Sequence, residues 1–338
     1  MKTLLKNMII PALASRPFSS LAASLFGQGI PVFMLHRMTD KSQRLRGTTP
    51  QHLRQCLSYL RENQYTFISL ETLIHSLAQQ QPLPEKAIVF TMDDGFQDQA
   101  KIAAPIFLEF GCPLTFFVIT GMIDQSLWPW DAQTSWIIDN TEKENLLVEL
   151  HDETLHIKIN KTGNRHQARD IIRNALKETS ATDVPAILHQ LAEVADVTLP
   201  EKAPSTYQPL TWDDARELEN KGIQFAPHSM SHHILSKLDR ESCSQEILSS
   251  WGRLQKEMAR PLNVFCYPTG RLFDFGPREI DILQQAGFIG AVATIPGYVD
   301  IKQDFKGQVF RIPRFELPDN MADFIQYCSW IQYAKQSK

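Results

Sequence analysis

The chain has 338 residues, of which 43% are hydrophobic and 21% charged, and its formal net charge is −4. These values are typical of a globular protein with a large core, and they exclude an intrinsically disordered chain. The basic residues are dispersed, which gives no nucleic-acid footprint. The five cysteines are far apart and odd in number, so the sequence indicates neither a disulfide framework nor a thiolate metal site.

The first 29 residues form a segment of mixed character. An apolar run, Met8–Ala14, follows two lysines, but it is short for a signal peptide and contains Pro11. No stretch approaches the roughly 20 apolar residues of a transmembrane helix. We therefore expect residues 1–29 to form an amphipathic segment that packs on the rest of the protein or touches a membrane surface. We also expect the protein to be cytoplasmic or peripheral to the membrane.

From residue 30 onward, apolar strand-like runs alternate with helical periods. Strands are predicted at 30–36, 67–70, 87–92, 114–120, 223–227, 264–267, 289–295 and 308–312. Helices are predicted to begin at Thr49-Pro50 and Thr211, to follow the strand at 67–70, to span 97–110, 239–258 and 277–286, and to begin near Asn320. This alternation argues for a parallel β/α architecture, and about seven or eight core strands argue for a barrel.

Residues 121–205 interrupt the alternation. The segment opens with Trp128-Pro-Trp130, becomes charged and helical, and contains a run at 151–158 that alternates like a solvent-facing strand. We interpret it as an inserted subdomain over the carboxyl-terminal face of the barrel, either a packing flap or a contact for the substrate. The predicted organisation is an N-terminal segment at 1–29, a barrel at 30–120 and 206–338, and the insertion at 121–205.

Two polar clusters directly follow predicted buried strands. Asp93 and Asp94 follow the apolar run 87–92, and His228 and His232 follow the run 223–227. Singly, Asp-Asp-Gly is a common turn and His-x-x-x-His a common solvated helix face. Strand ends are nevertheless where α/β folds place their chemistry. The i, i+4 spacing would put both imidazoles on one side of a helical turn. Two histidines and one carboxylate leave open coordination positions, as hydrolytic metal chemistry requires.

Three segments together resemble the motifs of the polysaccharide deacetylase family (carbohydrate esterase family 4, the NodB-homology domain). They are Thr91-Met-Asp-Asp-Gly95, His228-Ser-Met-Ser-His232 and Phe265-Cys-Tyr-Pro-Thr-Gly270. The resemblance covers about residues 30–120 and 205–317. It implies an α/β fold, a distorted and incomplete (β/α)7-type barrel. It also implies metal-dependent hydrolysis of the N-acetyl group of an amino sugar in a glycan or glycolipid.

The resemblance also implies roles for individual residues. A divalent ion, Zn²⁺ or a similar one, would be bound by Asp94, His228 and His232. Asp93 would be the general base, and the backbone N–H of Thr269 would stabilise the oxyanion.

Two positions depart from the family pattern. Cys266 stands where the family usually has an arginine that orients the base. Arg271, Arg311 or Arg314 could replace it, and Arg314 is preferred because it follows a predicted strand end; solvation at the surface is the alternative. The family's late histidine, its general acid, has no counterpart after His233. We assign His36 to that role because a closed barrel places its first strand beside its last. The alternative is a histidine that merely caps the strand.

These observations leave three hypotheses for function. The first is an N-deacetylase acting on an amino-sugar glycan or glycolipid. The second is an N-deacylase that removes a different group, such as formyl, from a lipid-linked sugar. The third is a catalytically inactive barrel that binds glycan. The presence of both Asp93 and Asp94 favours an enzyme, whereas the missing arginine and late histidine favour an inactive barrel.

Overall fold

The computed structural model describes residue 10 and residues 29–39, 46–150, 153–159, 165–300 and 308–336. The predicted N-terminal segment 1–29 therefore lies outside the described residues, apart from Ile10 and Gly29. Ile10 is buried against Ile325 and Ile331 near the C-terminus. Among the described helices, none has the length and apolar character needed to span a membrane.

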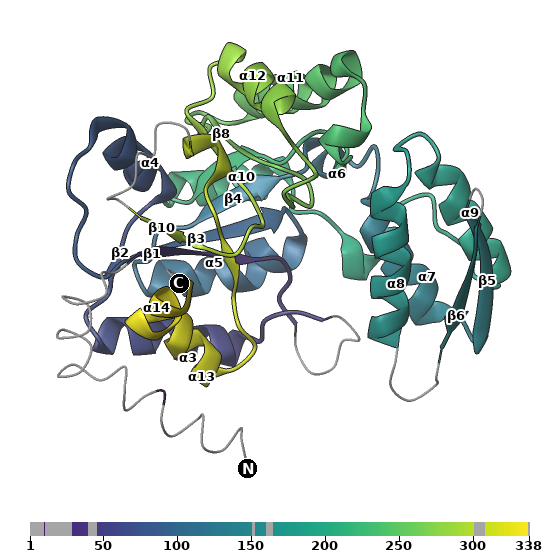
Figure 1. Cartoon of the computed structure of the whole chain (residues 1–338), viewed down its shortest axis with the longest axis horizontal. Helices are drawn as coiled ribbons and strands as arrows, with labels where there is room; N and C mark the ends of the chain where they lie inside the picture. Colours follow the sequence, from purple (N-terminus) through teal and green to yellow (C-terminus); the bar gives the residue numbers. More distant parts are fainter. Residues whose placement is uncertain are drawn as a thin grey trace.

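Parallel strands form a distorted barrel (Figure 1). They are β1 (Ile30–Leu35), β3 (Ala87–Asp94), β4 (Thr115–Val118), β7 (Gln224–Pro227), β8 (Val264–Cys266), β9 (Gly290–Val292) and β11 (Phe315–Glu316). Every residue of β1 and β3 is buried, which explains their continuous apolar runs. β1, β3, β4 and β7 pair in that order, β8 pairs with β9, and β11 closes back onto β1.

The barrel ring is weakest at two places. Between β7 and β8, the backbone–backbone connection among the described residues is a hydrogen bond from Leu262 N to Phe225 O, 2.8 Å long. Between β9 and β11, a single parallel bridge joins Val292 to Ile312. The prediction of a distorted (β/α)7-type barrel is confirmed.

Helices cover the outside of the barrel. They are α3 (Pro50–Glu62), α4 (Leu70–Gln79), α5 (Ala104–Glu109), α6 (Thr120–Ile123), α10 (Trp212–Asn220), α11 (Arg240–Glu257), α12 (Pro277–Gln285), α13 (Met321–Cys328) and α14 (Trp330–Gln336). Thr49 caps α3 by accepting from His52 N, and Thr211 and Asp214 form the predicted capping box of α10. Two short strands, β2 (Thr66–Phe67) and β10 (Tyr298–Val299), pair with β3 and β1.

Three predicted elements differ from the structure. The strand predicted at 67–70 ends at Phe67, because Ser69 caps α4 instead. The helix predicted at 97–110 opens as a π-helix over Gln99–Ala103, next to Pro105, which has no N–H to donate in a regular helical ladder. The strand predicted at 308–312 is wrong. Residues Val309–Arg311 form a 3₁₀ turn closed by a bond from Arg311 N to Gln308 O.

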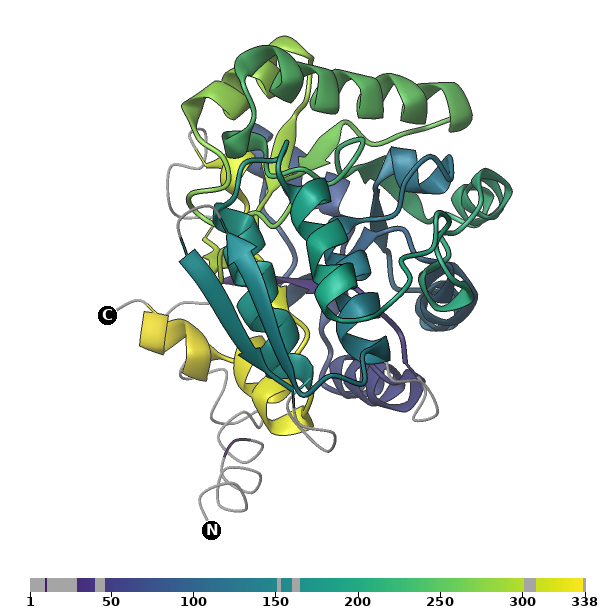
Figure 2. The ribbon, with the colours of Figure 1, turned by 90° about the vertical axis from the view of Figure 1, so that its right-hand side faces the viewer.

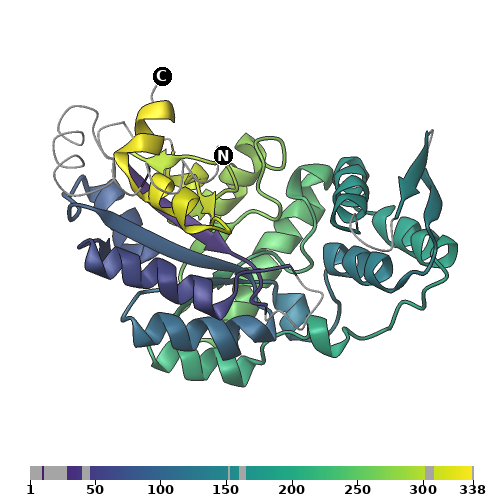
Figure 3. The ribbon, with the colours of Figure 1, turned by 90° about the horizontal axis from the view of Figure 1, so that it is seen from below.

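The segment that interrupts the barrel folds around a core of its own. It lies in front of the barrel in Figure 2 and to the right of the barrel in Figure 3. It contains α7 (Trp130–Asn140), β5 (Asn145–Leu150), β6 (Glu153–Lys158), α8 (Arg165–Glu178) and α9 (Val184–Val194). β5 and β6 pair as an antiparallel hairpin, so the single strand predicted at 151–158 is one of two. The boundaries of the inserted subdomain, 121–205, remain a prediction.

Candidate active site

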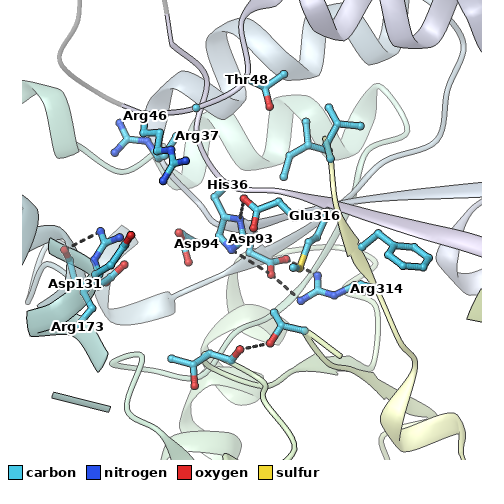
Figure 4. A pocket seen from close by; sticks show the side chains of 18 of the residues that line it. His36, Arg37, Arg46, Thr48, Asp93, Asp94, Asp131, Arg173, Arg314 and Glu316 are labelled. Carbon is cyan, nitrogen blue, oxygen red and sulfur yellow. Dashed lines mark hydrogen bonds and ion pairs between the residues drawn. The ribbon is translucent and has the colours of Figure 1, made fainter. Parts of the chain in front are cut away.

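A cavity of about 940 Å³ lies where the carboxyl ends of the barrel strands face α7 and α8. It is lined by every residue predicted for the site: His36, Asp93, Asp94, His228, His232, Thr269 and Arg314. Figure 4 shows His36, Asp93, Asp94 and Arg314 on the barrel side of this pocket, with Asp131 and Arg173 on the other side. The topology therefore brings together residues that are far apart in the sequence.

Asp94, His228 and His232 form a group that could hold a metal ion. Asp94 Oδ1 lies 3.7 Å from His228 Nε2 and 3.8 Å from His232 Nε2. Ligand atoms about 2.1 Å from a zinc ion in roughly tetrahedral geometry are themselves about 3.4 Å apart. All three side chains are buried. The spacing therefore suits a small divalent ion without rearrangement of the backbone.

Each imidazole directs Nε2 toward Asp94 because its other nitrogen faces a protein group. His228 Nδ1 lies 2.8 Å from the carbonyl oxygen of Cys266, and His232 Nδ1 lies 3.7 Å from Asp131 Oδ1. Burial, together with the nearby His232, lowers the pKa of His228 to about 3. The His228 ring is thus neutral at ordinary pH, which is the form that binds metals.

The two histidines do not lie on a helical turn, so that prediction is wrong. Residues 228–232 form a loop in which Ser229 and His232 have φ values of 64° and 63°. The loop carbonyls of Ser229 and Met230 accept bonds from Thr120 N and Gly121 N instead of from an i+4 partner. The two imidazoles therefore approach each other through a loop and not through the repeat of a helix.

Asp93 is engaged differently from its neighbour Asp94. Arg314 Nη1 donates to Asp93 Oδ1 and Nη2 donates to Oδ2, each over 2.7 Å. Burial by itself would raise the pKa of the Asp93 carboxyl, but the charge and hydrogen bonds of Arg314 hold that pKa well below its usual range. Asp93 is therefore an oriented carboxylate whose ionised form is favoured.

Of the three arginines considered, Arg314 contacts Asp93, whereas Arg271 lines the pocket with other partners and Arg311 lies outside the pocket lining. Arg271 pairs with Asp274 and Glu178, and Arg311 lies over the ring of Phe275. Cys266 Sγ is 3.1 Å from Arg314 Nη2 and 3.5 Å from Asp93 Oδ2. The short side chain of Cys266 leaves room for Arg314, which directly precedes β11.

Asp93, His228 and Cys266 also lie close enough to share an ion. This second grouping suits a metal less well. The Asp93 carboxylate already accepts two bonds from Arg314. Burial raises the pKa of the Cys266 thiol well above its ordinary value, so the thiolate form needed for binding is disfavoured.

His36 directly follows β1 at the rim of the pocket. Its Nε2 lies 3.9 Å from Asp93 Oδ2, and its Nδ1 lies 3.9 Å from Glu316 Oε1. Burial lowers the pKa of His36, but the negative charges of Asp94, Glu316 and Asp93 outweigh it, and the resulting pKa is raised. The side chain is 34% exposed. His36 can therefore carry a proton beside the carboxylate pair and still reach a substrate.

Thr269 lies in the turn after β8 with a φ of 55°. Its hydroxyl donates to Asp274, and its carbonyl accepts from Thr294 Oγ1. Within the described part of the chain, its backbone N–H has no hydrogen-bond partner. That N–H is therefore available to a ligand at the pocket.

The structure adds site residues that motif reasoning missed. Asp131, in α7, faces His232, and Trp130 Nε1 donates to the carbonyl oxygen of His232 over 3.2 Å. Glu246, in α11, accepts from Met230 N at 3.0 Å and from Ser231 N at 2.9 Å. The predicted strand–helix pattern gives no sign of these contacts, because each joins segments whose relative position is set only by the folded barrel.

Comparison with known proteins bears on this arrangement. A family profile described as polysaccharide deacetylase matches residues 80–290. The chain belongs to the polysaccharide deacetylase family. It is also 29% identical over 118 residues to the poly-β-1,6-N-acetyl-D-glucosamine N-deacetylase of Escherichia coli strain K12. That match covers 34% of this chain and 17% of the E. coli protein.

Two solved structures have a similar fold. The Streptococcus pyogenes deacetylase PplD, solved with acetate, superposes with a TM-score of 0.59 at 16% identity, covering 89% of this chain and 98% of PplD. IcaB from Ammonifex degensii gives a TM-score of 0.57 at 15% identity, covering 90% of this chain and 98% of IcaB. At such low identity these two likenesses establish the fold alone.

Proposed function

We propose that this protein is a metal-dependent N-deacetylase that removes acetyl groups from an amino-sugar glycan or glycolipid. The observation that carries the proposal is that two adjacent carboxylates have different partners. Asp94 faces the imidazole rings of His228 and His232, whereas Asp93 accepts hydrogen bonds from Arg314. An inactive glycan-binding barrel has no chemical need for this second, oriented carboxylate.

The proposed ion is Zn²⁺, bound by Asp94, His228 and His232. When bound, such an ion polarises a carbonyl and lowers the pKa of a coordinated water toward about 7. The Asp93 carboxylate accepts the proton of the attacking water, and Arg314 fixes its orientation. The backbone N–H of Thr269 donates to the oxygen that becomes negatively charged. His36 donates a proton to the departing amine nitrogen.

The proposed substrate class is an N-acetylated hexosamine. Support comes from the family and from the E. coli relative, whose name specifies a poly-N-acetylglucosamine. Because the match covers only 17% of that relative, its polymer is not assigned to this protein as the substrate. Removal of another N-acyl group is the second candidate within the same chemistry, and a formylated amino sugar is its test compound.

The deciding experiment measures metal content and acetate release with N-acetylglucosamine oligomers. The purified protein should hold about one divalent ion per chain and release acetate. The His228→Ala variant should lose both, because two ligands bind an ion far less well than three. Full metal occupancy in His228→Ala would refute the ligand assignment. A metal-loaded wild-type protein that cleaves neither acetyl nor formyl amides would point to the inactive barrel.

A further inference from the structure

Helix α8 presents a row of cations to the active-site pocket. Arg169, Arg173 and Lys177 are spaced four residues apart, so they share one face of the helix. All three line the same cavity as the metal-binding group. The predicted insertion therefore contributes positive charge to a site whose proposed chemistry acts on a neutral amide.

Arg173 is built into the pocket wall without a carboxylate partner among the described residues. Its Nη2 donates to the carbonyl oxygen of Asp131 at 3.1 Å and to Ser135 Oγ at 2.6 Å, both neutral acceptors. Its Nε is buried and has no hydrogen-bond partner. Arg169, by contrast, pairs with Asp139 at 3.2 Å. Arg173 thus keeps an unused Nε–H donor, and the Asp131 carboxylate acts on its charge through space without an ion pair.

Lys177 lies one turn further along, between two other cations. The described part of the chain offers its ammonium group no hydrogen bond or ion pair. Arg271, which lines the pocket from the barrel side, is committed to Asp274 and Glu178. Burial, with the charges of Arg271 and Arg173, lowers the pKa of Lys177. Like charges on a partly buried face repel one another, and a bound anion relieves that repulsion.

Among the described residues, no acidic side chain forms an ion pair or a hydrogen bond with Arg173 or Lys177, although the charges of Asp274 and Asp131 act on Lys177 through space. Asp93 is bound to Arg314, Asp94 faces the two histidine ligands, and Asp131 faces His232. Asp170, on the same helix, is exposed to solvent at the rim and forms no ion pair among the described residues. Arg173 and Lys177, on one face of α8, are therefore open to an external anionic ligand.

We propose that the substrate carries a phosphate group on or next to the N-acetylated sugar, and that Arg173 and Lys177 bind this phosphate. This inference rests on the proposed deacetylase function and specifies its substrate. Arginine and lysine form strong charge-assisted hydrogen bonds with phosphate oxygens. The tetrahedrally arranged oxygens of a phosphate can accept from two cations that lie one helical turn apart, which the two coplanar oxygens of a carboxylate do less well.

Calorimetry with zinc-loaded protein tests the proposal without relying on turnover. N-acetylglucosamine 1-phosphate should bind at least about tenfold more tightly than N-acetylglucosamine. Lys177→Gln should remove most of that preference and leave the affinity for the neutral sugar unchanged. Lys177→Arg should restore the preference. Lys101→Gln, which removes an exposed lysine outside the pocket, is the matched control and should behave as wild type.

Further ligands identify the source of the phosphate and separate competing explanations. A dodecyl phosphodiester of N-acetylglucosamine that binds more tightly than the monoester indicates a lipid-linked substrate; the reverse order indicates a free sugar phosphate. An N-acetylated disaccharide containing glucuronate that binds better than either overturns the phosphate assignment. A phosphate preference that survives in Lys177→Gln means that the phosphate binds the metal directly, which also overturns it.

Failure of this inference and failure of the proposed function give different results. Acetate release from neutral oligomers with no preference for phosphate refutes the anion site and leaves the deacetylase intact. Tight, Lys177-dependent binding of the sugar phosphate with no acetate release from any ligand refutes the deacetylase and leaves the anion site.

Discussion

Arg314 and Asp93 lie 221 positions apart in the sequence and meet through two parallel hydrogen bonds of 2.7 Å each. Both side chains are almost fully inaccessible, with 0% and 1% of their surface exposed. A buried carboxylate without this partner would be forced toward its neutral form. The pair therefore keeps the proposed base ionised and fixes the direction of its oxygens.

Removal of Arg314 should damage both the fold and the activity. Arg314→Ala leaves the Asp93 charge buried and unpaired, which should cost about 3–5 kcal/mol in the free energy of unfolding. Arg314→Lys keeps a charge but loses the bidentate geometry, so it should fold better than Arg314→Ala and still lose turnover. Denaturant unfolding and acetate release measure the two effects. Arg311→Ala, on an exposed neighbour, is the control, and equal destabilisation in it would contradict the assignment.

The two adjacent aspartates should respond differently to the same change. Asp93→Asn should keep the metal but lose turnover, because a neutral amide cannot accept the proton of the water. Asp94→Asn should reduce metal occupancy itself, because the carboxylate that faces His228 and His232 is lost. Metal analysis after dialysis, paired with acetate release, distinguishes these outcomes. Identical metal content in the two variants would show that the proposed division of roles is wrong.

His36→Ala should lower kcat by about 10²–10⁴-fold, as is usual for loss of an acid–base group. Metal content and folding should stay unchanged, because His36 is not a proposed ligand. The loss should shrink for an activated acetate ester, whose leaving group departs without protonation. Near-normal amide turnover would place the acid elsewhere. Loss of the metal would instead make His36 a ligand.

Asp131 should support metal binding from outside the ligand set. Asp131→Asn removes the negative charge that faces His232 Nδ1, and loss of such a supporting carboxylate typically weakens metal affinity about 10–100-fold. Competition with a chelator measures the change. Asp170→Asn alters a solvent-exposed aspartate of the same pocket and should leave the affinity unchanged. An unaltered affinity in Asp131→Asn would show that the His232 ring is held by other contacts.

Local sequence signals identified most of the strands and helices because each depends on neighbouring residues. β1 is apolar throughout and β3 is mainly apolar up to Met92, and Thr49 and Thr211 cap helices as their side chains predict. The strand predicted at 308–312 is wrong because a strand needs neighbouring backbone to pair with, which a local run of residues cannot guarantee. In the barrel only Ile312 finds a partner, and the preceding residues turn.

The candidate site could be predicted from the sequence only through side chains at the end of a strand or directly after it. The strand ends placed Asp93, Asp94 and His228 together, since parallel strands deliver their carboxyl ends to one face. Asp131, Trp130 and the cations of α8 could not be assigned to the pocket. Their positions depend on how the separately packed helices meet the barrel, and no periodic pattern encodes that.

The loop that carries His228 and His232 is held at several independent points: the backbone of α6, the carboxylate of Glu246 and the indole of Trp130. Such bracing means that the loop shape is set by the surrounding fold and does not depend on the ion. Metal uptake should consequently lose little chain entropy, in contrast to small domains that are unfolded without zinc. Chelation should therefore abolish activity reversibly while the circular dichroism of the protein stays that of the folded chain.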